Sequence, residues 1–101
     1  MLKLISLLKR ADGLSKEDFA KWVAEDHFEF AKNLPGLRRY TVNVAVAEDA
    51  AFDAVNEMWF DDEDARAAAF ASDAGKAAAG DAGAHTSSRV HVVSVEHELI
   101  R

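Results

Sequence analysis

The only proline of the chain, Pro35, stands where the hydrophobic period of the sequence changes. Residues 15–33 carry large apolar side chains at helical spacing, whereas residues 37–46 alternate between two faces as a strand does. Proline lacks a backbone donor and pushes the residue before it out of the helical region, so Pro35-Gly36 ends the helix. This part of the sequence therefore predicts a helix, a tight turn and a strand in succession.

Three further segments have the short apolar runs that are typical of strands: residues 2–8, 54–60 and 88–100. Acidic residues at the start of 61–72 predict a helix there. The glycines of 73–87 weaken helices, so we expect a short helical piece followed by a loop. The order strand-helix-strand-strand-helix-strand predicts an α+β, ferredoxin-like βαββαβ fold, in which a four-stranded antiparallel sheet carries both helices on one face.

The first predicted helix has a recognisable start and a buried side. Ser15 followed three residues later by Asp18 resembles a capping box. The side chains expected at the core, or beside it, share helical spacing: Phe19, Trp22, Val23, His27 and Phe30.

Length and composition restrict the class of protein. The 101 residues suit one domain spanning 1–101. A net charge of −6 argues against nucleic-acid binding, which needs a basic surface to neutralise phosphates. The chain has no cysteine and no apolar run of membrane-spanning length, so we expect no membrane association and a cytoplasmic location.

Helices on one face of the predicted sheet leave its other face open. Several strands carry large apolar residues on both faces, and an exposed apolar patch of this kind needs a cover. A second copy of the chain is the simplest cover, so we expect a homodimer that forms a dimeric α/β barrel.

Features spread along the whole chain resemble the EthD family, and within it the methylmuconolactone methylisomerases. They include "F--W----H" in the first helix, "LPGLRRY" at the turn, "E-WF" in the third strand and a C-terminal "EHELI". The resemblance implies a ferredoxin-like fold, a dimer and a cleft. It also implies that His27 and Tyr40 match a histidine and a tyrosine that line this cleft in the methylisomerases. Other members are linked to an ether-degrading oxygenase system or to aromatic polyketide processing.

Two candidate catalytic residues flank the turn. The His27 imidazole titrates near neutrality and suits a general acid or base, although it would equally cap the helix end. The Tyr40 hydroxyl could donate to a developing enolate or lactone oxygen, or Tyr40 could simply be a core residue.

Glu57 and Trp59 lie two residues apart in the third strand and therefore share a face. Glu57 is a third candidate catalytic residue if that face borders a dry pocket, because burial would raise the pKa of its carboxyl group. The simpler interpretation is an ion pair with a nearby arginine such as Arg38, Arg39 or Arg89. For substrate contacts, the sequence suggests Trp22, Val42 and Trp59.

We expect no cofactor and no metal. His91 and His97 would lie about 20 Å apart on one strand, too far for one ion, and no glycine-rich phosphate loop is present. Three functions stay open. The first is a cofactor-free enzyme that isomerises, cyclises or oxygenates a small oxygenated ring compound such as a lactone or phenol. The second is a binding or accessory dimer that partners an oxygenase, and the third is a purely structural dimer.

Overall fold

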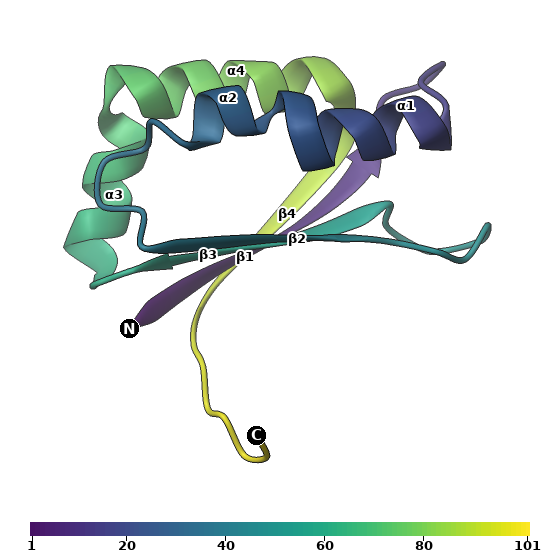
Figure 1. Cartoon of the computed structure of the whole chain (residues 1–101). Helices are drawn as coiled ribbons and strands as arrows, with labels where there is room; N and C mark the ends of the chain where they lie inside the picture. The colour runs from purple at the N-terminus through teal and green to yellow at the C-terminus, as the bar shows by residue number, and fades with distance from the viewer.

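The computed structural model describes residues 1–101, and it confirms the ferredoxin-like α+β fold (Figure 1). Four strands form one antiparallel sheet in the order β2-β3-β1-β4. The helices lie over one face of this sheet, and the other face is open. The elements run in the order β1 (Leu2–Arg10), α1 (Lys16–Lys21), the π-helical segment η1 (Trp22–Asp26), α2 (Phe28–Ala31), β2 (Arg39–Val44), β3 (Ala54–Phe60), α3 (Glu63–Ala71), α4 (Asp73–His85) and β4 (Thr86–Val95).

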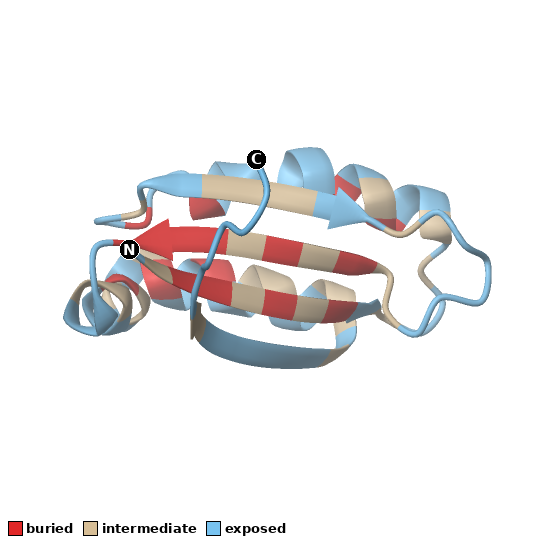
Figure 2. Ribbon diagram, turned by 90° about the horizontal axis from the view of Figure 1, so that it is seen from below, coloured by how far each residue is buried: buried red, intermediate tan, exposed pale blue.

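Strand alternation determines which side chains meet the helices. On β3, Met58 and Phe60 belong to the core, together with Leu4 of β1. Residues between them on each strand point to the open face, and the alternation of more and less buried positions is visible along β1 and much of β3 in Figure 2. A second cluster beneath α1 contains Phe19 and Val23.

The first helix begins as predicted but its phase changes partway. The Ser15 Oγ accepts a hydrogen bond from the Asp18 backbone N–H at 3.0 Å, which caps the helix. Phe30, expected in the buried stripe, is 38% exposed, and Ala31 is fully buried instead. The π-helical segment η1 accounts for this error, because its wider turn shifts the helical phase of every later residue.

The helix α4 is longer than the sequence predicted. Residues 73–85 form one continuous helix, not a short piece followed by a loop. The Ser72 Oγ accepts from the Gly75 N–H at 3.1 Å and so caps its first turn. Gly75 is needed there, because a Cβ at this position would collide with the backbone of Ala69 and Phe70.

The last strand also differs from its predicted range of 88–100. It begins at Thr86 and ends at Val95, which pairs with Leu2 at the start of β1. Beyond Val95 only Met1 precedes the paired part of β1, and residues 96–101 leave the sheet. They project on the side opposite the helices (Figure 1). None of the helices combines the length and hydrophobicity that a membrane crossing requires.

Candidate functional site

The π-helical segment places Trp22 and His27 on the same side of the first helical region. In a regular α-helix, residues five apart differ by about 140° in direction. Here the His27 N–H bonds to the Trp22 carbonyl at 2.8 Å, the i→i+5 pattern of a π-helix. The two rings consequently lie 4.9 Å apart between centroids. Single π turns are frequent at functional sites.

Both side chains bind one carboxylate, Asp81 of α4. Its Oδ2 lies 2.8 Å from Nδ1 of His27 and accepts from Nε1 of Trp22 at 3.0 Å. On the other side, Oδ1 lies 3.4 Å from Nδ1 of His85, whose ring stacks on Trp22 at 4.6 Å. An ionised carboxylate can only accept hydrogen bonds, so Nδ1 of His27 carries a hydrogen and Nε2 is the ring nitrogen left for a ligand.

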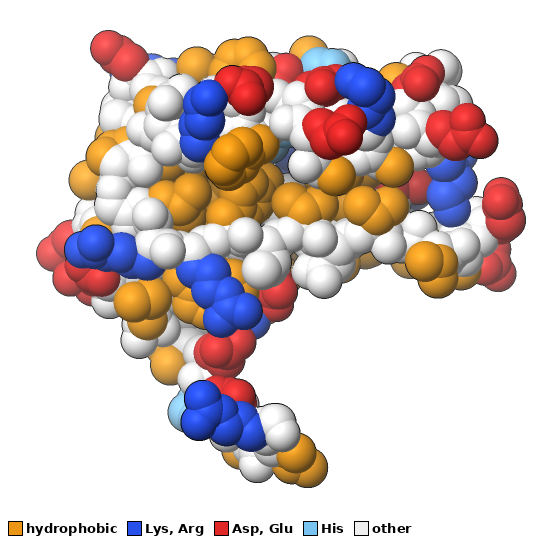
Figure 3. Space-filling view, in the orientation of Figure 1, with side chains coloured by type: hydrophobic (Ala, Val, Ile, Leu, Met, Phe, Trp, Pro, Cys, Tyr) orange, Lys and Arg blue, Asp and Glu red, His pale blue; other side chains and the backbone are white.

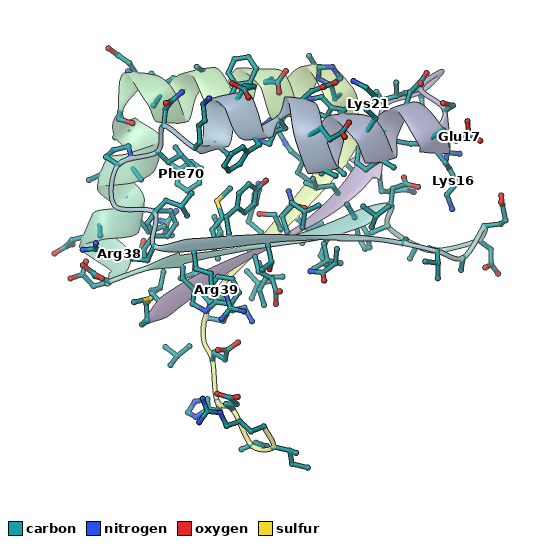
Figure 4. All side chains as sticks on the ribbon, viewed as in Figure 1. Lys16, Glu17, Lys21, Arg38, Arg39 and Phe70 are labelled. Atoms are coloured by element: carbon teal, nitrogen blue, oxygen red, sulfur yellow. The ribbon has the colours of Figure 1, made fainter.

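His27 lines a cavity of about 160 Å³ between the sheet and the helices. Figure 3 shows hydrophobic side chains gathered along the seam between these two layers. Phe70 projects from α3 into this space (Figure 4). The apolar lining includes Leu4, Leu8, Met58, Phe70, Ala78 and Ala82. His27 is 5% exposed and is thus an imidazole in a largely apolar enclosure.

A row of polar side chains crosses the floor of the cavity. Asn56 of β3 pairs in register with Ser6 of β1, and Ser6 pairs with His91 of β4. All three residues line the cavity. The Ser6 Oγ and the His91 Nδ1 share a hydrogen bond of 2.8 Å. Burial, reinforced by the nearby charges of Arg89 and Arg66, lowers the pKa of His91 below 6.5, which favours a neutral ring at neutral pH.

Tyr40 lies next to this row and is joined to it. Its hydroxyl accepts a hydrogen bond from Nδ2 of Asn56 at 3.3 Å. Burial raises the pKa of Tyr40 to about 12, so the phenol stays protonated at neutral pH. Val42, also predicted to contact substrate, pairs with Asn56 and packs against the cluster under α1. Tyr40 and Val42 border the cavity lining without belonging to it.

Trp22 is likewise absent from the cavity lining. It is 3% exposed and packs against Phe19, with its indole N–H committed to Asp81. Trp22 therefore does not contact a ligand in the cavity but holds the Asp81 carboxylate that binds His27.

The structure does not bring Glu57 and Trp59 to His27. They share a face, as predicted, but it is the open face of the sheet, because Asn56 and Met58 occupy the alternate positions toward the helices. Glu57 forms an ion pair with Lys3 at 2.8 Å, and this contact holds the pKa of its carboxyl group below 4.5. The expected arginine partner is therefore replaced by a lysine.

Trp59 is covered by cations on this open face. The Lys3 Nζ lies 4.8 Å and the Arg39 Cζ 4.5 Å from its ring centroid. Figure 4 shows Arg39 on the side of the sheet away from Phe70 and the helices. Together with the Glu57 ion pair, these contacts make a polar and aromatic cluster that is separate from the cavity.

Sequence reasoning missed Asp81, Ser6, Asn56 and the cavity role of His91. Asp81 stands in an Ala/Gly-rich stretch that gave no chemical signal of its own. The other three were detectable in principle. Ser6 and Asn56 each stand between apolar neighbours on the helix-facing side of their strand, and antiparallel pairing places both in one row with His91.

The fold and the site define a small ferredoxin-like protein with a buried histidine–aspartate pair beside an apolar cavity. A family model for the EthD domain matches residues 11–87, and the chain belongs to the EthD family. No protein with a curated description matches it in sequence.

Several solved structures are similar to this chain. An EthD family protein from Bacillus halodurans is 27% identical, with a TM-score of 0.78 over 96% of this chain and 99% of that one. A dimeric ferredoxin-like protein from Thermobifida fusca is 20% identical, with a TM-score of 0.77 over 94% and 90%. SnoaB from Streptomyces nogalater, described as a cofactor-independent oxygenase, is 19% identical, with a TM-score of 0.70 over 95% and 92%. At 20% and 19% identity, the similarity to the last two proteins is evidence for a shared fold alone.

Proposed function

We propose that this EthD-family chain is a cofactor-free enzyme that performs acid/base chemistry on a small oxygenated ring compound. The observation that carries the proposal is the buried His27 imidazole, bound at Nδ1 by Asp81, on the wall of an apolar cavity. Perturbed or tightly oriented titratable groups in such a cavity are typical of catalytic sites.

In this proposal, Nε2 of His27 takes a proton from a ligand hydroxyl or from a carbon next to a carbonyl group. Asp81 stabilises the imidazolium that forms, as a carboxylate does in a histidine–aspartate pair. Asn56 and the neutral His91 supply hydrogen bonds to the ligand from the cavity floor. The resulting anion would then isomerise, cyclise, or be oxygenated with dioxygen as the oxidant.

The similarity to SnoaB supports this class of function at the level of the fold, because that protein is described as a cofactor-independent oxygenase. The same cavity would also serve a non-catalytic binding protein that partners an oxygenase. The two functions differ in whether His27 moves a proton, and that difference can be measured directly.

The test measures how fast single-ring phenols and lactones take up deuterium from D₂O. The rate is monitored as the loss of their proton NMR signals. We expect the native protein to accelerate exchange for one compound class. His27→Gln should reduce the rate by about 10²–10⁴-fold. The exposed His97 in the C-terminal tail provides a matched control, and His97→Gln should leave the rate unchanged. Binding of a compound without any deuterium exchange would contradict the enzymatic function and favour the non-catalytic binding function.

We also propose that the chain forms a homodimer through the open face of its sheet. Val90 and Val92 of β4 point to this face, since Arg89 and His91 line the cavity on the other side, and they are 43% and 46% exposed. Two similar solved structures are described as dimeric, which supports a second copy as the cover of these residues.

Sedimentation equilibrium of the native chain should give twice the monomer mass. Val92→Lys should shift the equilibrium strongly toward monomer, because a charge on an apolar interface is costly. Val46→Lys, at a loop position that is 98% exposed, is the matched control and should stay dimeric. A native protein that is monomeric at all concentrations would contradict the proposal.

A further inference from the structure

One polar atom of a cavity-lining residue has no partner. The Asn56 side chain is 5% exposed, and its Nδ2 donates to the Tyr40 hydroxyl. Its Oδ1 is buried and accepts no hydrogen bond. Buried polar groups in proteins are almost always paired, because leaving one unpaired is costly. An unpaired acceptor inside a cavity therefore points to a donor that arrives with a ligand.

Asn56 is one of the residues that line the cavity, so its side-chain amide lies beside the space that a ligand would occupy. Asn56 lines the cavity in the same polar row as Ser6 and His91, whose Oγ and Nδ1 share a hydrogen bond. His27 lines the same cavity from the helix side. A ligand in this space can thus meet an unpaired acceptor on the floor and an imidazole nitrogen on the opposite wall.

The size of the cavity limits the ligand. A volume of about 160 Å³ is close to that of an engineered apolar cavity of about 150 Å³ that binds benzene. One six-membered ring fits such a space, whereas a fused polycycle does not. Substituents have room in an adjoining hollow, lined by Arg66 and Val93, that shares Leu4, Phe70 and His91 with the cavity.

We propose that Asn56 is a specificity-determining residue: its Oδ1 accepts a hydrogen bond from a hydroxyl group of a single-ring ligand, so the cavity selects phenols and enols over lactones. A lactone offers only acceptors and would leave Oδ1 unpaired in the bound state. A site built to pair with a hydroxyl rejects an analogue that lacks it. The inference rests on the proposed function, since it names the substrate class of the same site.

The test compares phenol with a matched probe that lacks the donor and with a lactone. Phenol and fluorobenzene have similar size and shape, but only phenol donates, and γ-butyrolactone represents the lactones. Binding is measured by NMR through the ring signals of His27. We expect the native protein to bind phenol at least about tenfold more tightly than either of the other two.

The variant Asn56→Leu keeps the approximate side-chain size and removes the acceptor. We expect its preference for phenol over fluorobenzene to fall well below the native one, with Nε2 of His27 still able to accept from the hydroxyl, whereas Asn33→Leu, at an exposed position after α2, should keep the native preference. Equal binding of phenol and fluorobenzene by the native chain would overturn the inference while leaving the proposed function intact. Equal binding by the native chain would overturn the inference even if Asn56→Leu fails to fold. Failure of every probe to bind or to move the His27 signals would overturn both proposals.

Discussion

Replacement of Phe60 by alanine is expected to lower the free energy of unfolding by about 3–5 kcal/mol. Phe60 ends β3, is fully buried, and packs in the cluster that contains Leu4 and Met58. Its ring centroid lies 6.1 Å from that of Phe70, in an edge-to-face arrangement. Truncation would remove these contacts and leave a void that the sheet and helices fill only partly.

Urea denaturation of the native chain and the variant measures this difference. Phe28→Ala is the matched control, because Phe28 is 47% exposed on α2. Its effect should stay within about 0.5 kcal/mol. A loss below about 1 kcal/mol for Phe60→Ala would show that the core at this end of the sheet is not packed as the structure describes.

The second large effect is expected at Asp81. Asp81→Ala removes the acceptor for two buried donors, Nε1 of Trp22 and Nδ1 of His27. Leaving both donors unpaired should cost about 2–5 kcal/mol of unfolding free energy. The exposed Asp64 on α3 is the matched control, and Asp64→Ala should have little effect. A change of less than about 0.5 kcal/mol for Asp81→Ala would contradict the bonded network.

Asp81→Asn separates the structural role of this residue from its electrostatic one. The amide keeps an oxygen that can accept from His27 and Trp22, so we expect a smaller loss of stability than for alanine. It lacks the negative charge that would stabilise an imidazolium formed during proton transfer. Deuterium uptake should therefore fall by about 10²-fold or more while the variant stays folded. An unchanged rate would remove Asp81 from the proposed chemistry.

The fold could be predicted because local patterns and global architecture agree. The strand at 54–60 was bounded correctly. The turn at Pro35-Gly36 is also present, and Gly36 has a φ of 77°, which glycine adopts readily. The ends of β4 were wrong because they depend on where a neighbouring strand stops, and local sequence does not contain that information.

The candidate site was only partly predictable. His27 was identified from its residue type and from the resemblance, but its orientation depends on one π turn that no spacing rule indicated. Its partner, Asp81, lies 54 residues away, in a segment whose glycines predicted only a short helical piece followed by a loop. Glu57 was a candidate catalytic residue and Trp59 a candidate substrate contact. Strand alternation places both on the face of the sheet opposite the cavity.

The central claim is that His27 holds its hydrogen on Nδ1 toward Asp81 and offers Nε2 to a ligand in the cavity. Nitrogen-15 NMR of the histidine rings, assigned with His27→Gln, tests this most directly. We expect neutral His27 to show a protonated Nδ1 and an unprotonated Nε2, and the Nε2 signal to move saturably as phenol is added. A hydrogen on Nε2, together with signals that ignore every single-ring compound, would contradict the claim.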